Sequence, residues 1–174
     1  MDGTGRPASG EYHPYYETYV SLVGPGSITA TLEANASETL DLLGRIPEDR
    51  ANLAYAPGKW TLKQVVGHMS DTERVFAYRL LRAARGDTTR LAGFDQDPWA
   101  GAWDVTGVPL ASLVAEFGAV RASTLFLLRH LGPDDWTRRV NASEADVSVR
   151  ALAFMIAGHE LHHMGVLKRE YLGQ

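Results

Sequence analysis

Two histidines near the end of the chain, His159 and His163, have the spacing of a metal-binding pair. They are four residues apart, and successive residues of a helix turn by about 100°, so both side chains would lie on one helix face. The same face is apolar, because it also carries Leu152, Met155, Ile156, Val166 and Leu167. An unpaired polar group is costly in apolar surroundings, so two buried imidazoles would need partners, and one divalent metal ion could serve both.

The segment from His159 to His163 also spells H-E-x-x-H, the motif of the zinc metalloproteases called zincins. Those enzymes take a third ligand downstream of the motif. Here the only downstream residue of a ligand type is Glu170, which lies roughly 10 Å beyond His163 along the same helix. Glu170 is therefore too far away to bind the same ion, and the third ligand is expected upstream of the motif.

His68 is the best candidate for that third ligand. It lies on a different predicted helix, among apolar residues, and a helix bundle can bring inward-facing side chains of two helices to one point. Three neutral imidazoles with an open fourth position are typical of a catalytic rather than a structural metal site. The alternative is that His68, His159 and His163 are core histidines that bind no metal.

Three further residues could contribute to chemistry at such a site. Glu160 and His162 flank the metal-binding face on opposite sides, each about 80° from its midpoint. Each could bond a neighbouring helix, or it could orient a metal ligand, shuttle a proton or act as a general base. Arg79, three helical turns beyond His68, could hold an anionic group of a bound substrate or cofactor, or extend toward the end of the bundle.

The composition excludes several classes of protein. The chain has 174 residues, enough for one domain with its own core, and a net charge of -4, which gives no general attraction to nucleic acid. It has no cysteine, so disulfides, thiolate-ligated zinc and a cysteine nucleophile are excluded. We find no apolar run of the roughly 18–20 residues that span a membrane and no signal-peptide pattern, so we expect a soluble cytoplasmic protein that acts on a small molecule.

Apolar periodicity and capping signals predict four long amphipathic helices. Their ranges are 27–44, 61–85, 110–131 and 148–172. Thr61 and Gln64 form a capping box at the start of the second helix. The polar stretch 134–146 is expected to be a loop, and no βαβ pattern is present, so the sequence predicts an all-α four-helix bundle.

The segments outside these helices complete the domain organisation. Residues 1–11 are expected to be a flexible tail, and residues 12–174 a single domain. The connection 88–109 is longer than most loops in compact domains, so it is expected to be functional or packed as a lid. Its Trp99 and Trp103 could cover a pocket above the metal or anchor the connection to the core.

The last helix carries a second apolar line on the side opposite the histidines, formed by Phe154, Leu161 and Leu172. A surface helix of a monomer seldom carries such a line. We predict that it packs on the N-terminal segment or on a second subunit.

With these residues in view, the chain resembles the DinB/YfiT-like superfamily of metalloenzymes, from about Tyr19 to Leu172. Each motif that carries the resemblance is weak alone, but together they follow the order and spacing of the family. The motifs are Tyr55–Thr61 before the second helix, Gly67–Arg74 around His68, Arg85–Asp87 and Phe94–Asp97 in the following connection, and Gly158–His163 in the last helix.

The resemblance implies a four-helix bundle with a long crossover connection rather than simple up-down neighbours. It implies a divalent ion, zinc or nickel, on His68, His159 and His163, with water completing the coordination, and a tendency to form homodimers. Characterised relatives are thiol S-transferases that use bacillithiol or mycothiol, or mycothiol-dependent isomerases, and others are described as metal-dependent hydrolases.

Three functions follow as hypotheses. The first is a metal-dependent S-transferase that joins a low-molecular-weight thiol to an electrophilic small molecule; the thiol must be a co-substrate because the chain has no cysteine. The second is a hydrolase with a metal-activated water and Glu160 or His162 as general base. The third is a non-enzymatic metal-binding stress-response protein, which predicts a fourth protein ligand or a pocket without room for substrate.

Overall fold

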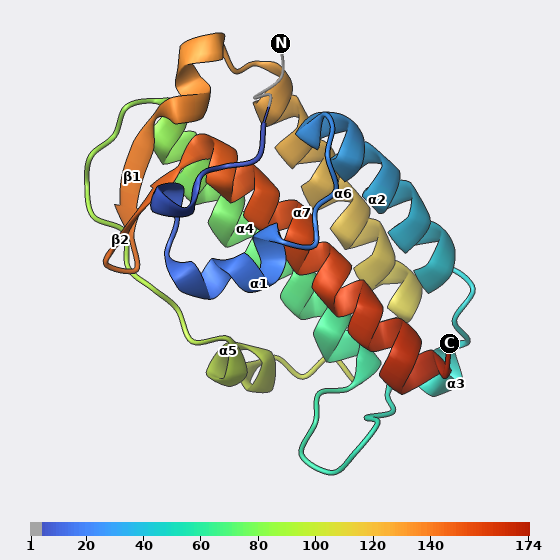
Figure 1. Cartoon of the computed structure of the whole chain (residues 1–174). Coiled ribbons are helices and arrows are strands. Elements are labelled where there is room, and N and C mark those ends of the chain that lie inside the picture. The colour runs from blue at the N-terminus through green and yellow to red at the C-terminus, as the bar shows by residue number, and fades with distance from the viewer. Residues whose placement is uncertain (1–4) are drawn as a thin grey trace.

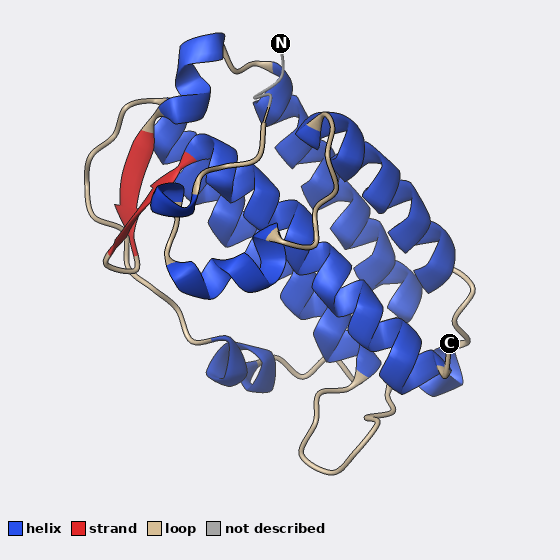
Figure 2. Ribbon diagram, in the orientation of Figure 1, coloured by secondary structure: helices blue, strands red, loops and turns tan. Residues whose placement is uncertain are grey.

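Four long helices form the bundle in the computed structural model, which describes residues 5–174 (Figure 1, Figure 2). They are α2 (Ile28–Leu43), α4 (Leu62–Ala84), α6 (Leu110–Arg129) and α7 (Val149–Val166), and α7 continues into a π-helical turn, Leu167–Leu172. These bounds lie within two residues of the predicted ones, and the predicted all-α four-helix bundle is confirmed.

Side-chain caps explain where three of these helices begin. The hydroxyl of Ser27 accepts a hydrogen bond from the backbone of Ala30 at 3.2 Å, and the hydroxyl of Ser148 accepts one from Ala151 at 3.0 Å. The predicted capping box of α4 is present, because Thr61 accepts from the Gln64 backbone at 3.2 Å and the Gln64 side chain accepts from the Thr61 backbone at 2.8 Å.

The order of the helices around the bundle is not sequential. α2 packs against α6 and α7, and α4 also packs against α6 and α7, so α2 lies diagonally across the bundle from α4, and α6 lies diagonally across from α7. Figure 1 shows α4 and α6 running in the same direction, which requires the connection between them to travel the length of the bundle. Lys63 at the start of α4 accordingly bonds the carbonyl of Thr106, just before α6, at 3.1 Å. The predicted long crossover is confirmed.

Two segments expected to be irregular contain regular structure. The crossover holds a short helix, α5 (Gln96–Ala102), and the stretch after α6 holds a hairpin of β1 (Arg139–Ala142) and β2 (Ala145–Ser148) in antiparallel register. The prediction of a plain loop over 134–146 was therefore wrong. Its turn residues Ser143 and Glu144 have φ of 54° and 64°, a conformation usually signalled by Asn-Gly or Asp-Gly, so the sequence carried no hairpin signal.

The N-terminal segment is tied to the domain before Tyr12. Of the expected tail, residues 1–4 lie outside the described part of the chain. From there on, Arg6 donates to the carbonyls of Val20 and Val23 at 2.5 and 3.2 Å. Glu11 is 5% exposed and accepts from Ser148 at 2.7 Å and from Arg150 at 2.5 Å. Residues 6–11 are thus held in place by buried polar contacts, which a Gly- and Ser-rich sequence does not reveal.

The short helix α1 (Glu17–Val20) covers the side of α7 opposite the bundle interior. Phe154 is buried and Leu161 packs against the same core cluster, which also contains Val20 and Val23 of the N-terminal segment. Packing on the N-terminal segment therefore accounts for Phe154 and Leu161 of the second apolar line. Contact of this line with a second subunit stays a prediction.

By length and composition α6 could cross a membrane, with a mean hydropathy of 1.4, a feature that the sequence analysis did not recognise. In this structure α6 packs against α2 and α4. Its central Arg121 is 1% exposed and is paired with carboxylates of two other helices. We therefore treat α6 as a core helix of the bundle.

Candidate metal centre

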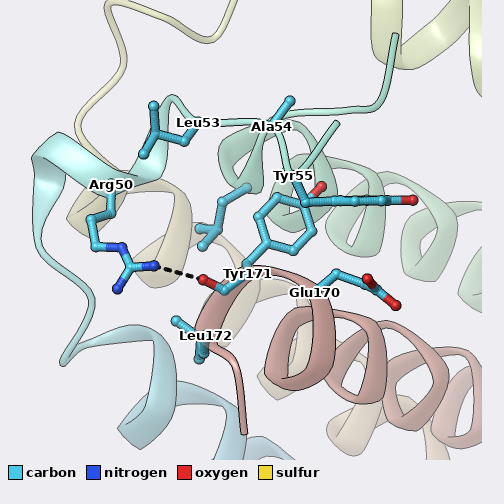
Figure 3. A pocket seen from close by; sticks show the side chains of 8 residues that line it. Arg50, Leu53, Ala54, Tyr55, Glu170, Tyr171 and Leu172 are labelled. Carbon is cyan, nitrogen blue, oxygen red and sulfur yellow. Dashed lines mark hydrogen bonds between the residues drawn. The ribbon is translucent and has the colours of Figure 1, made fainter. Parts of the chain in front are cut away.

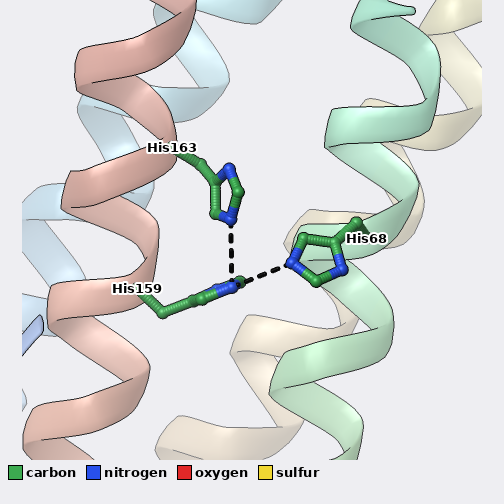
Figure 4. Close-up of side chains that lie close together, drawn as sticks. All are labelled: His68, His159 and His163. Carbon is green, nitrogen blue, oxygen red and sulfur yellow. Dashed lines mark hydrogen bonds between the residues drawn. The ribbon is translucent and has the colours of Figure 1, made fainter. Parts of the chain in front are cut away.

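Three histidine side chains meet between α4 and α7, at the position predicted from their spacing (Figure 4). The Nε2 atom of His159 lies 3.0 Å from Nε2 of His68 and 3.1 Å from Nε2 of His163. One ligand atom of each residue lies within 4.8 Å of the others. The fold therefore brings together all three predicted ligands, two from α7 and one from α4.

Burial keeps the three imidazoles neutral. It lowers the pKa of His68 to about 4 and that of His163 to about 3, and it lowers the pKa of His159 well below its ordinary value. Repulsion among the clustered rings acts in the same direction. Neutral imidazole is the form that binds a metal ion.

The geometry fits a divalent metal. A ring nitrogen carries either one hydrogen or one lone pair, so Nε2 of His159 can make one good hydrogen bond but not two. Its two close contacts therefore cannot both be satisfied by the imidazoles alone, whereas a central cation accepts the lone pairs of all three rings. Imidazole nitrogens that share one zinc ion lie roughly 3.3 Å apart. The two contacts of His159 Nε2 measure 3.0 and 3.1 Å, and all three ligand atoms lie within 4.8 Å of one another.

Neighbouring side chains fix the orientation of the rings. Trp60 packs on His68, with ring centroids 4.8 Å apart, and the hydroxyl of Thr72 lies 3.4 Å from Nδ1 of His68. Tyr19 meets His159 edge-on at 5.2 Å. α1 can approach α7 this closely because the residue before His159 is Gly158. A Cβ at Gly158 would lie 2.0 Å from the carbonyl oxygen of Tyr19.

Glu160 belongs to a buried ion-pair network. Its Oε1 accepts from the hydroxyl of Thr39 at 2.7 Å, and its Oε2 accepts from Arg121 at 2.7 Å. Arg121 also bonds both oxygens of Glu73 at 2.8 and 2.9 Å and the carbonyl of Leu32 at 3.0 Å. Burial raises the pKa of Glu160, although Arg121 opposes the shift.

This network joins all four bundle helices at one guanidinium. Glu73 is five residues after His68 on α4, and Glu160 directly follows His159 on α7, so Arg121 links the two helices that carry the ligands. Both oxygens of Glu160 are engaged, which favours the alternative in which Glu160 bonds neighbouring helices and positions α7. A catalytic role of Glu160 stays a prediction.

His162 and Arg79 have different surroundings. His162 is partly buried, with its ring 5.5 Å from Tyr19 and 5.1 Å from His163, so it borders the cluster without joining it. Arg79 donates to the carbonyl of Ala92 at 2.8 Å and to the hydroxyl of Ser143 at 3.0 Å. It holds the crossover and the hairpin turn against α4, and its role in holding an anionic group of a substrate or cofactor stays a prediction.

Two cavities reach the cluster from different sides. One, of about 320 Å³, includes His159 in its lining, and the other, of about 410 Å³, includes His163. The His159 cavity is lined by Tyr15, Tyr16, Tyr19, Thr72, Phe76, Phe94, Asp95, Gln96 and His159. The His163 cavity is lined by Tyr55, Gly58, Lys59, Trp60, Val65, Asp97, His163, Val166 and Tyr171.

The crossover closes over a third side. Phe94, Trp99 and Trp103 line a narrow space beside His68, and the Trp103 ring packs against the α-carbon side of Gly67. The two tryptophans therefore lie over the α4 side of the cluster, in agreement with the prediction that this connection is packed as a lid.

A smaller hollow near the C-terminus is not part of this site. It holds about 160 Å³ and lies between the segment around Tyr55 and the π-helical turn, where Arg50 donates to the carbonyl of Tyr171 at 2.8 Å (Figure 3). None of its described lining residues is a histidine of the cluster.

Sequence reasoning missed two contributors to the site. Arg121 lay on a helix with no predicted chemistry, and its partners Glu73 and Glu160 are distant in sequence. An arginine among inward-facing apolar residues of a helix is the signal that could have identified it. The contact of Tyr19 with His159 depends on the packing of α1 at Gly158, for which the sequence shows only an isolated glycine in a helix.

Three proteins of similar sequence are described as metal-dependent. Two proteins of Oceanobacillus iheyensis, each described as a "putative metal-dependent hydrolase", are 22% identical over 79% of this chain and 79% of the relative, and 26% identical over 67% of each. A likewise described protein of Geobacillus kaustophilus is 23% identical over 77% of this chain and 76% of its own length.

Solved structures agree on the fold. YfiT of Bacillus subtilis, described as "a probable metal-dependent hydrolase with an unusual four-helix bundle topology", superimposes with a TM-score of 0.65 at 16% identity, over 95% of this chain and 93% of YfiT. A DinB-like protein of the same species, YjoA, gives a TM-score of 0.60 at 20% identity, over 84% of this chain and 92% of YjoA. The family model of the DinB superfamily matches residues 31–167, which include all three clustered histidines, and the chain therefore belongs to the DinB superfamily.

Proposed function

We propose that this protein is a metal-dependent S-transferase that joins a low-molecular-weight thiol to an electrophilic small molecule, with zinc or nickel on His68, His159 and His163. The observation that carries the proposal is the pair of cavities that reach the cluster from different sides. A transferase must admit two reactants at once, and each cavity is large enough for a small molecule.

A divalent ion held by the three imidazoles supplies Lewis acidity, which lowers the pKa of a thiol beside it and makes the thiolate available at neutral pH. The thiolate sulfur forms a bond to the electrophilic carbon, whose leaving group departs with the bonding electrons. A ring nitrogen of His162, beside His163 at the edge of the cluster, accepts the proton of the thiol. The chain has no cysteine, so the thiol comes from a co-substrate.

The second candidate is a hydrolase in which water takes the place of the thiol, and the descriptions of the relatives favour it. In that reaction His162 is the remaining candidate for the general base, since Glu160 is bonded through both oxygens. A purely structural metal site has less support, because the described residues bring three ligands together and no fourth.

Binding of a thiol at the centre separates these candidates. Protein loaded with Co²⁺ or Ni²⁺ is titrated with N-acetylcysteine while near-ultraviolet absorption is recorded, with His163→Ala as control. We expect a sulfur-to-metal charge-transfer band in the wild type and none in the variant. The zinc-loaded protein should then accelerate the reaction of the thiol with 1-chloro-2,4-dinitrobenzene, with release of chloride, above the uncatalysed rate. A metal-loaded protein that shows no thiol band and hydrolyses esters or amides instead would refute the transferase.

A further inference from the structure

The His159 cavity is walled largely by aromatic rings. Tyr16 meets Phe76 edge-on with centroids 6.0 Å apart, and Phe76 meets His159 at 6.2 Å. Phe94 on the crossover also lines the cavity, and its ring is tilted against that of Trp99 with centroids 4.7 Å apart. Aromatic pairs at such spacings favour edge-to-face and offset arrangements, so a further flat ring entering this space would gain the same contacts.

The charges around the cavity select against anions. Its described lining contains neither lysine nor arginine, and its acidic residue is Asp95. The Arg79 guanidinium lies over the Phe76 ring, 5.9 Å from its centroid, and is bonded to Ala92 and Ser143. In the metal-free protein an anionic ligand would therefore lose its hydration without gaining a cationic partner from these side chains, whereas a metal ion on His159 would itself attract an anion. The His163 cavity differs, because Lys59 lines it.

Three of the aromatic residues belong to the N-terminal segment, which is a fixed wall. Tyr15, Tyr16 and Tyr19 all precede residue 31, where the match to the superfamily begins. The segment is held by the bonds of Arg6 and Glu11 and by the close contact of Tyr19 with Gly158. The aromatic wall thus lies outside the family-model match, although the YfiT superposition, which covers 95% of this chain, extends over most of this segment, and the wall is placed against one of the clustered histidines.

We propose that the His159 cavity binds the aromatic ring of an uncharged small molecule, and that the N-terminal tyrosines determine this specificity. The inference rests on the proposed function in one respect, that the bound molecule is the electrophile of the transfer. A volume of about 320 Å³ suits a ligand of one or two rings.

Three probes of matched size test the proposal: benzyl alcohol, benzoate and cyclohexylmethanol. Their dissociation constants are measured by ligand-observed nuclear magnetic resonance with the zinc-loaded and the metal-free protein. Tyr15→Leu is the test variant, because Tyr15 lines this cavity and is 58% exposed, so the fold does not depend on it. Tyr55→Leu is its matched control: the same exchange at a 41% exposed tyrosine in the lining of the other cavity.

We expect benzyl alcohol to bind the metal-free protein at least several-fold more tightly than benzoate or cyclohexylmethanol does. Tyr15→Leu should weaken the binding of benzyl alcohol by about 2- to 12-fold, the loss of one aromatic contact, and Tyr55→Leu should leave it unchanged. Equal binding of benzoate to the metal-free protein, equal sensitivity to both variants, or no binding of benzyl alcohol at millimolar concentration overturns the proposal. Ring binding is measured without metal, so it is independent of the thiol band. Loss of ring binding with the thiol band intact refutes only this inference, and loss of the thiol band with ring binding intact refutes only the proposed function.

Discussion

Replacing Arg121 by methionine should destabilise the bundle more than any exposed substitution. The Arg121 side chain is 1% exposed and bonds Glu73 and Glu160, whose side chains are 4% and 2% exposed. Methionine fills much of the same volume but leaves two buried carboxylates without a cation. Breaking a buried ion pair by removing one partner costs about 3–5 kcal/mol, a large part of the roughly 5–15 kcal/mol that holds a domain folded.

Urea unfolding of the metal-free protein measures this cost. For a chain of this size the loss corresponds to a fall in the melting temperature of roughly 6–20 °C. Arg129→Met is the matched control, because Arg129 pairs with Glu33 on the surface, where the side chains are 49% and 46% exposed. That exchange should cost less than about 1 kcal/mol.

The pH dependence identifies the cause of the loss. Burial already raises the pKa of Glu160, and removing Arg121 raises it further. A carboxyl whose folded-state pKa is raised destabilises the fold at higher pH, and the penalty shrinks as the pH falls and the group becomes protonated. The deficit of Arg121→Met should therefore shrink between pH 7 and pH 5, and adding Glu73→Gln and Glu160→Gln should restore part of the stability at pH 7. A loss below 1 kcal/mol, or one that neither treatment relieves, would refute the reasoning.

Two further predictions concern the helix that carries most of the cluster. Gly158→Ala would place a Cβ 2.0 Å from the Tyr19 carbonyl oxygen and should lower the free energy of unfolding by about 1–3 kcal/mol. Gly165→Ala on the same helix is the control: its Cβ meets nothing within 4 Å, so the free energy of unfolding should rise by about 0.5–1 kcal/mol. Equal effects of the two variants in urea unfolding would contradict the packing of α1 on α7. In the metal-free protein, burial lowers the pKa of His68 to about 4 and that of His163 to about 3, below the ordinary 6.5. On unfolding, His68 and His163 regain their ordinary pKa and take up protons below pH 6.5. The free energy of unfolding should therefore be independent of both residues above pH 6.5 and fall by about 1.4 kcal/mol per pH unit for each of them between pH 6.5 and pH 5. A flat profile between pH 6.5 and pH 5 would contradict the burial of the cluster.

Local sequence signals predicted the four helices and the clustering of the three histidines. The 3.6-residue period placed all four helices, and the Thr61 capping box located the start of α4. The spacing of His159 and His163 fixes them on one face of α7, and the apolar surroundings of His68 directed it to the same interior.

Features that depend on tertiary contacts could not be predicted in this way. The Arg121 network joins residues up to 121 positions apart, and its donors and acceptors become partners only once the helices pack. The hairpin turn at Ser143 and Glu144 uses positive φ at residues that do not favour it, with the hydroxyl of Ser143 held by Arg79. A second bond of Arg79, to the carbonyl of Ala92, ties the crossover to α4, and this contact also has no local sequence signal.

The metal content of the purified protein tests the central claim most directly. Plasma mass spectrometry should find about one divalent ion per chain in the wild type, after purification or after titration with zinc or nickel, and none in His68→Ala or His163→Ala. Because the two variants remove ligands from different helices, loss in both would establish a centre shared by α4 and α7. A wild-type protein that carries no metal and takes up none on titration would contradict the account and leave three buried core histidines.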